Sequence, residues 1–205
     1  RLIPGEDTTI EYKPKYLDAS LISQSPSIAI GQAKQEIIRM GQYSVQGLQE
    51  AMQHINTYDK KHVNTAAQIE EAINSLDQKT TEYLVSISKK SLSGHDSKVH
   101  NVLLENIRDI ERIGDHVENL FELTEFIENN GAQLSEDAMQ ELNDMLELVV
   151  QTASLAIQSL DQLDVNVAKQ VLANEDQIDH MERKLRKNHI VRLNNGICTG
   201  YAGVI

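Results

Sequence analysis

The chain has 205 residues, a length that allows one domain or two small ones with a sizeable core. Aromatic residues make up 4% of the chain and Trp is absent, a composition that favours helices over sheets. The net charge of -12 disfavours non-specific binding to nucleic acid or anionic lipid, and the single cysteine, Cys198, excludes an internal disulfide.

The start of the chain holds all of its prolines, Pro4, Pro14 and Pro26. We expect residues 1–25 to form an extended linker, and Ser25 followed by Pro26 predicts the start of a helix. The chain begins without Met and ends within an apolar segment, so we expect a piece of a longer protein. No run approaches the roughly 18 apolar residues of a membrane span, and no signal peptide is present.

Beyond residue 26 there is no proline, and apolar residues recur at helical spacing. The predicted helices span residues 26–57, 61–92, 95–129, 134–162 and 165–194, with a sixth beginning near 197. Helices of this length are typical of bundles. We predict an all-α fold, with one complete antiparallel three-helix bundle over residues 26–130 and an incomplete second one over 134–205.

The chain also repeats itself at an offset of 105 residues. Identical residues recur at this offset, among them Met40 and Met145, Ala51 and Ala156, Asp59 and Asp164, Glu70 and Glu175, and Ile73 and Ile178. A duplicated three-helix unit would show such a pattern. The second copy of the third helix would lie beyond residue 205, so we expect the second bundle to be truncated.

The third predicted helix carries carboxylates beside its apolar stripe. At about 100° per residue, one face holds Leu103, Ile107, Ile110, Gly114, Val117 and Phe121. Glu111, Asp115 and Glu118 lie along one edge of that face, where a neighbouring helix would pack. Carboxylates at a packed seam are costly unless they are paired or bind a cation.

The second predicted helix carries a similar polar row, made of Glu70, Asn74 and Asp77. This row flanks a stripe of Ile69, Ile73, Leu76, Thr80 and Ile87. Antiparallel packing would bring the two rows together into an oxygen-lined site that suits Mg²⁺, Ca²⁺, Mn²⁺ or iron. The alternative is ordinary salt bridging at the seam, with Arg108 and Arg112 as partners.

Signs of catalysis are lacking in the sequence. It contains no Gly-rich phosphate loop, nucleophile elbow or Cys-x-x-Cys motif. The seven histidines are scattered, and none forms the Glu-x-x-His pair of di-iron carboxylate proteins. We therefore predict that the chain is not an enzyme.

The segment Glu-Arg-Ile-Gly-Asp-His at 111–116, followed by Val-Glu-Asn at 117–119, resembles the signature of the PhoU family of phosphate-uptake regulators. The resemblance covers residues 27 to 205. It implies two tandem three-helix bundles of spectrin-like form, and a Glu/Asp-x-x-x-Asp motif on paired helices that binds metal in some members.

The residues that match this motif differ between helices. Glu111-x-x-x-Asp115 and, in the second repeat, Glu175-x-x-x-Asp179 match it, whereas Glu70-x-x-x-Asn74 carries an amide at the last position. The resemblance thus implies a divalent metal, which could be Mg, Mn, Fe, Zn or Ca.

A second resemblance lies at the start of the chain. Tyr-Leu-Asp at 16–18, Pro26, and the run from Ala33 to Gly41 resemble the entry into the PhoU-like tail of bacterial sodium/phosphate cotransporters. This implies a soluble regulatory domain on the cytoplasmic face of the plasma membrane of a bacterium, joined to an N-terminal membrane domain of the same protein. Sodium and phosphate would bind elsewhere in that parent protein.

Two alternatives stay open: a free-standing PhoU-type regulator of phosphate uptake and phosphate-responsive signalling, and a purely structural bundle. The truncated second bundle also leads to an expectation about partners. The apolar stripes of 134–162 and 165–194 would lack a covering helix, and an exposed patch of that size tends to find a partner. We expect a homodimer or oligomer that forms through the second half, and no nucleic-acid partner.

Overall fold

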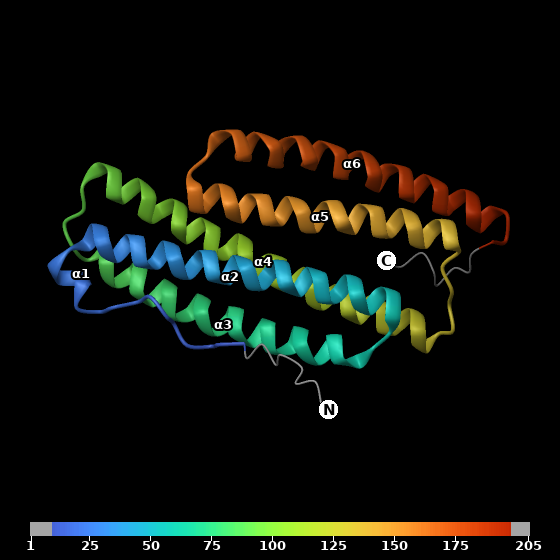
Figure 1. The fold of residues 1–205 in the computed structure, drawn as a ribbon, viewed down its shortest axis with the longest axis horizontal. Helices are drawn as coiled ribbons and strands as arrows, with labels where there is room; N and C mark the ends of the chain where they lie inside the picture. Colours follow the sequence, from blue (N-terminus) through green and yellow to red (C-terminus); the bar gives the residue numbers. More distant parts are fainter. Residues whose placement is uncertain (1–9, 198–205) are drawn as a thin grey trace, which may run out of the picture.

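The computed structural model describes residues 10–197, and regular structure in this stretch is entirely helical (Figure 1). The helices are α1 (Leu21–Gln24), α2 (Pro26–Thr57), α3 (Lys60–Ser88), α4 (Gly94–Asn129), α5 (Glu136–Gln162) and α6 (Val165–Asn194). The all-α prediction is confirmed. The short helix α1 was not predicted, and the predicted helix from about 197 lies almost wholly outside the described residues.

Helices α2, α3 and α4 pack against one another as a three-helix bundle (Figure 1). The apolar stripes predicted on α3 and α4 are buried in it, as the spacing required. Its largest fully buried side chains include Ile37, Met40, Ile73, Leu76, Leu84 and Ile107. Each such side chain contributes about 1.5–3 kcal/mol relative to an exposed one, so this core stabilises the first half of the molecule.

The repeat predicted from the sequence is visible in the turns as well as in the helices. Tyr58 and Leu163, which are 105 residues apart, both adopt the left-handed conformation, with φ of 55° and 54°. The next residue in each repeat, Asp59 or Asp164, accepts a hydrogen bond from the backbone N–H two residues on and so caps the following helix. Helices α5 and α6 are therefore the structural counterparts of α2 and α3.

The segment before α2 is held on the first bundle by a buried carboxylate. Glu36 is fully buried, and its Oε2 accepts hydrogen bonds from the backbone N–H groups of Lys15 at 2.8 Å and Tyr16 at 2.9 Å. Its Oε1 lies 2.7 Å from Nε of Arg39, whose Nη2 donates to the carbonyl oxygen of Lys13. The segment thus follows the bundle closely, although the sequence indicated only an extended linker.

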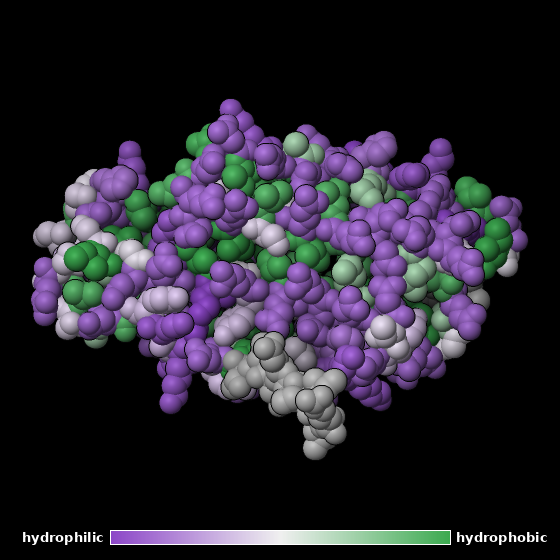
Figure 2. All heavy atoms as spheres, viewed as in Figure 1, coloured by the Kyte–Doolittle hydropathy of each residue, from purple (hydrophilic) through white to green (hydrophobic). Residues whose placement is uncertain are grey.

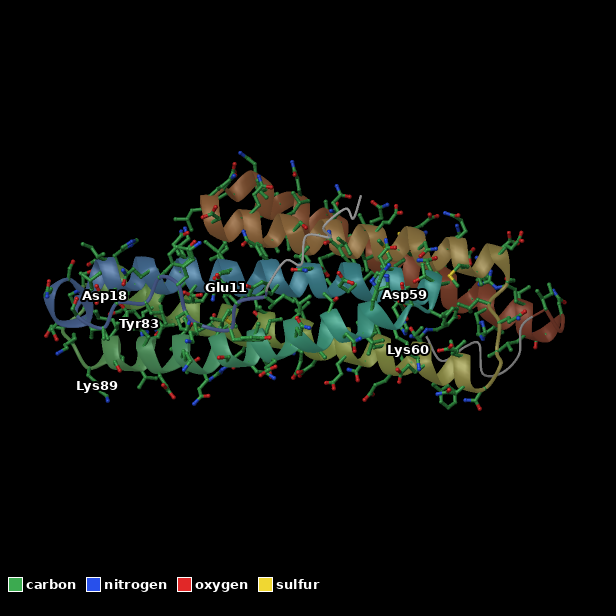
Figure 3. The ribbon with its side chains drawn as sticks, turned by 60° about the horizontal axis from the view of Figure 1, so that its bottom comes forward. Glu11, Asp18, Asp59, Lys60, Tyr83 and Lys89 are labelled. Carbon is green, nitrogen blue, oxygen red and sulfur yellow. The ribbon has the colours of Figure 1, made fainter. Side chains whose placement is uncertain are left out.

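A second contact fixes the same segment near α1. The hydroxyl of Tyr83 donates to the carbonyl oxygen of Asp18 at 2.8 Å, and the two residues lie together at one end of the bundle (Figure 3). Burial raises the pKa of Tyr83, which keeps the hydroxyl protonated and able to donate. Ile10, at the start of the described chain, is buried in the same core.

Helices α5 and α6 form a hairpin that packs on α2 through α5 (Figure 1). The closest approach uses Gly41, since a Cβ there would overlap Cδ1 of Ile157 and lie 2.8 Å from its Cγ1. Within the hairpin, Glu141 accepts hydrogen bonds from Asn188 at 2.5 Å and Arg192 at 2.9 Å. No residue of α6 is buried. Among residues 10–197, no helix is both long and apolar enough to cross a membrane.

Candidate functional site

The middle of α4, where the signature segment lies, forms one wall of a groove between α2, α3 and α4. The groove has a volume of about 210 Å³. Its lining is mostly apolar and comprises Val63, Ala66, Ala67, Ile69, Ile73, Val117 and Phe121, with Ser44, Gly47 and Gly114 and the carboxylates described next. The predicted apolar face of α4 therefore does more than fill the core, because three of its members also line this groove.

Carboxylates surround this apolar lining. Glu70 comes from α3, and Glu118, Glu122 and Glu125 come from α4. No Lys, Arg or His is among the described residues that line the groove. Such a site, apolar inside and negative at its edge, favours an apolar group that carries a neighbouring positive charge.

Two glycines make room for the groove. A Cβ on Gly47 would lie 3.3 Å from Cγ1 of Val117, which is a tight contact. A Cβ on Gly114 would come no closer than 3.6 Å to Ile73, an ordinary van der Waals distance. Glycine in a helix interior costs about 1 kcal/mol relative to alanine. Packing would accept alanine at 114, so no steric contact in the fold requires the glycine of the signature.

Phe121 is supported from behind by a buried histidine. The rings of His54 and Phe121 are stacked, with centroids 5.1 Å apart. His54 is 1% exposed, and its Nδ1 donates to the carbonyl oxygen of Asp59 at 3.3 Å. This contact helps to orient the Phe121 ring, which lines the groove.

The residues predicted to bind metal are only partly brought together. Glu70 and Glu118 both line the groove, whereas Asp115 is exposed and Glu111 is half-buried beside it. Within the described part of the chain, no three His, Cys, Asp or Glu side chains are grouped so that they could hold a metal ion. Metal binding by the first repeat stays a prediction.

The other members of the predicted polar row have partners within their own helix. The amide of Asn74 donates to Glu70 Oε1 at 2.5 Å, and Asp77 accepts from the hydroxyl of Thr81 at 2.9 Å. These bonds engage one carboxylate oxygen each of Glu70 and Asp77. In the second repeat, Glu175 and Asp179 are exposed on α6.

The alternative of salt bridging at the seam has no direct support either. Among residues 10–197, neither Arg108 nor Arg112 forms an ion pair with the carboxylates of α3 or α4. The seam is therefore a groove with a negative edge. Sequence reasoning missed Glu122 and Glu125, although their spacing from Glu118, four and seven residues, indicates one helix face.

Comparison with protein-family models gives one match. The model described as the PhoU domain matches residues 37–124 and 142–200, which together make up more than two thirds of the chain. The chain belongs to the PhoU family. The first matched stretch covers most of the three-helix bundle and all residues that line the groove except Glu125, and the second covers most of the α5–α6 hairpin.

Membership of the PhoU family indicates a regulatory role in phosphate transport, in a family of non-enzymatic domains. No curated protein and no solved structure matches the chain. Any narrower role must therefore be argued from the site.

Proposed function

We propose that the chain is the cytosolic regulatory domain of a sodium-dependent phosphate cotransporter, on the cytoplasmic face of the membrane, and that the groove between α2, α3 and α4 is where it engages the transport machinery. Family membership supports a role in phosphate transport. The resemblance of residues 16–41 to the start of a cotransporter tail supports the narrower assignment. The partner would be the membrane domain of the same protein.

The observation that carries the proposal is that the signature helix lines the groove. Gly114 leaves space that the packing does not require, and Glu118 supplies negative charge at its edge. The groove suits an apolar side chain with a basic neighbour on the segment that it receives. Binding of such a segment in one transport state and not another would bias transport, because a ligand shifts a conformational equilibrium only by its differential affinity.

The test is phosphate uptake in cells that depend on the parent system. Glu122→Lys reverses a charge at the groove, and Glu105→Lys reverses an exposed charge elsewhere on α4 as the matched control. We expect Glu122→Lys to abolish the response of radiolabelled phosphate uptake to phosphate supply, while the control keeps it. An unchanged response in Glu122→Lys would remove the groove from the mechanism.

A sodium arm distinguishes the cotransporter assignment from a free-standing regulator. Uptake is measured with sodium and again with sodium replaced by potassium. The proposal expects the Glu122→Lys effect only in the sodium-dependent part. An effect confined to sodium-independent uptake would favour a free-standing PhoU regulator instead, and the coding sequence upstream of Arg1 would then encode no membrane spans.

Metal binding at the Glu/Asp-x-x-x-Asp motifs has its own test. A cation that binds only the folded state raises the melting temperature by mass action. If Glu111 and Asp115 hold a cation, chelation should lower the melting temperature of the wild type and leave an Asp115→Ala variant unmoved. Equal melting curves with chelator and with added Mn²⁺, Fe²⁺ or Mg²⁺ would exclude the site.

A further inference from the structure

Helix α6 is the least covered long helix in the described chain. It contains no buried residue and packs mainly against α5, at the edge of the molecule away from α3 (Figure 1). Several of its large apolar side chains are open to solvent, including Val165 and Leu172, each 66% exposed, and Ile190, 53% exposed. Apolar side chains are visible among polar ones over the half of the surface that α5 and α6 form (Figure 2). The outer side of α6 therefore offers apolar contacts that nothing in the described chain covers.

One set of exposed residues of α6 forms a stripe. Val165, Leu172, Asp179 and Arg186 follow each other at intervals of seven residues, which keeps them on one side of a helix with a drift of about 20° per interval. At about 100° per residue, Asp176, Arg183 and Ile190 lie on the same side. This stripe is turned by about a third of a revolution from Leu185, which packs against Leu142 and Leu146 of α5.

Charge along this stripe is divided between the two halves of the helix. Asp176 and Asp179 lie on the stripe in the first half, with Glu175 at its edge, and Arg183 and Arg186 lie on it in the second half, with Lys187 at its edge; Lys169, near the start of the helix, is the exception. All seven side chains are exposed. The boundary lies at Met181, close to the middle of α6.

We propose that two copies of this chain pair through the outer stripe of α6, with the two helices antiparallel about a twofold axis near Met181. In that register each residue faces the one equally far on the other side of Met181 in the second copy. Asp179 then faces Arg183, and Asp176 faces Arg186, which within its own helix pairs with Glu182. Leu172 faces Ile190, so apolar contacts flank the central charges on both sides.

The charges on the stripe of α6 are complementary to themselves, which favours a second copy of this chain as the binding partner. A twofold contact presents the same surface on both subunits, so every pairing occurs twice. A parallel pair would place acidic residues against acidic ones, and like charges across an interface are costly. A helix from an unrelated partner would have no reason to match a charge reversal centred on Met181. The pairing leaves the groove of the first bundle free, so it is independent of the proposed regulatory site.

Charge-swap variants of the whole 205-residue chain test the pairing by sedimentation velocity. The wild type is expected to dimerise. Asp179→Arg and Arg183→Asp each place like charges across the axis, and each should raise the dimer dissociation constant about tenfold or more. An equimolar mixture of the two variants should recover dimers, because positions 179 and 183 are then both basic in one chain and both acidic in the other. The double variant in a single chain should also recover them.

Two controls separate this contact from a general effect of charge or folding. Lys79→Asp changes a charge at the α3 position equivalent to Lys184 and should leave the dimer unaffected. Leu172→Asp should give a folded monomer, because a side chain this exposed is not needed for folding, and circular dichroism would verify the fold. A wild type that stays monomeric at its highest attainable concentration would overturn the proposal. So would a dimer that ignores Asp179→Arg, or single variants whose mixture recovers nothing.

Discussion

The two repeats of this chain differ in how well the same pair of helices is covered. Helix α3 buries nine of its residues, whereas its counterpart α6 buries none. In the first repeat, α4 and the segment before α2 close the remaining faces. In the second, α5 and α6 are joined to the rest mainly through the α2–α5 contact.

The sequences of α3 and α6 differ in agreement with this difference in burial, because several apolar positions of α3 are polar in α6. The buried residues Ile69, Leu84 and Ile87 of α3 correspond to Asn174, His189 and Arg192 of α6. The hairpin is therefore more than a bundle that lacks one helix, since its inner face has become partly polar. We infer that stability resides chiefly in the first repeat, and the following variants test this comparison.

The largest difference is expected between two glutamates that hold segments together. Glu36→Ala removes the fully buried carboxylate of the first repeat, which pairs with Arg39 and accepts from the backbone of Lys15 and Tyr16, and should cost about 3–5 kcal/mol in the free energy of unfolding. Glu141→Ala removes the half-buried carboxylate of the hairpin and should cost about 1 kcal/mol. Urea unfolding followed by circular dichroism measures both, and equal losses would contradict the comparison.

A second pair uses the same residue at equivalent positions. Ile73 in α3 is 2% exposed, and Ile178 in α6 is half-buried. Ile73→Ala should cost about 3 kcal/mol because it leaves a cavity, and Ile178→Ala about 1 kcal/mol because water can reach the site. Thermal and urea unfolding of both variants would show whether the two repeats differ as proposed. A larger loss for Ile178→Ala would mean that the hairpin core is the stronger one.

These positions also show what the sequence could reveal. The helices and the buried faces followed from apolar spacing, because a 3.6-residue period identifies the face of a helix without knowledge of its neighbour. The 105-residue repeat was readable for the same reason. The sequence only partly predicts that α3 is buried and α6 is not, because burial depends on which helices pack against each other.

The candidate site was harder to predict than the fold. Spacing placed Glu70 and Glu118 at the same seam correctly, but it could not show that an apolar groove separates the helices there. The role of Glu36 was missed because its partners, the backbone N–H groups of Lys15 and Tyr16, leave no trace in side-chain patterns. A lone glutamate within an apolar stripe of a helix was the available signal.

The contact between the two repeats can be weakened by a single substitution at Gly41. Gly41→Ala forces a methyl group against Ile157 and should cost about 1–3 kcal/mol. Gly31→Ala is the control on the same helix, because nothing lies within 4 Å of its Cβ position, and it should stabilise by about 0.5–1 kcal/mol. Hydrogen exchange should quicken in α5 and α6 for Gly41→Ala and stay unchanged in α3. Faster exchange throughout the chain would show that the two repeats unfold as one unit.

The smallest expected effect is on stability at acid pH. It depends on the Asp96 carboxylate, which connects α4 to α2 in the first repeat. Hydrogen bonds from the hydroxyls of Ser27 on α2 and of Ser93 lower the pKa of Asp96 below its ordinary value of 3.8. Because the pKa is lowered in the folded state, this link stabilises the fold above the pKa of the unfolded chain. Its contribution is lost as the pH falls through the lower folded value.

Asp96→Asn should therefore lower the urea midpoint slightly at neutral pH and flatten its fall in acid. Ser27→Ala, which removes the bond that lowers the pKa of Asp96 most, should reproduce part of this change. Measurements from about pH 7 to about pH 2 would show both effects. As a control, the side chain of Asp164, which caps α6 as Asp59 caps α3, accepts a hydrogen bond from Asn166 of its own helix, so its loss should not alter the α2–α4 contact. If the urea midpoint of Asp96→Asn equals that of the wild type throughout the acid range, the contact of Asp96 with Ser27 contributes nothing to stability. The difference between the repeats then rests on apolar burial and Glu36.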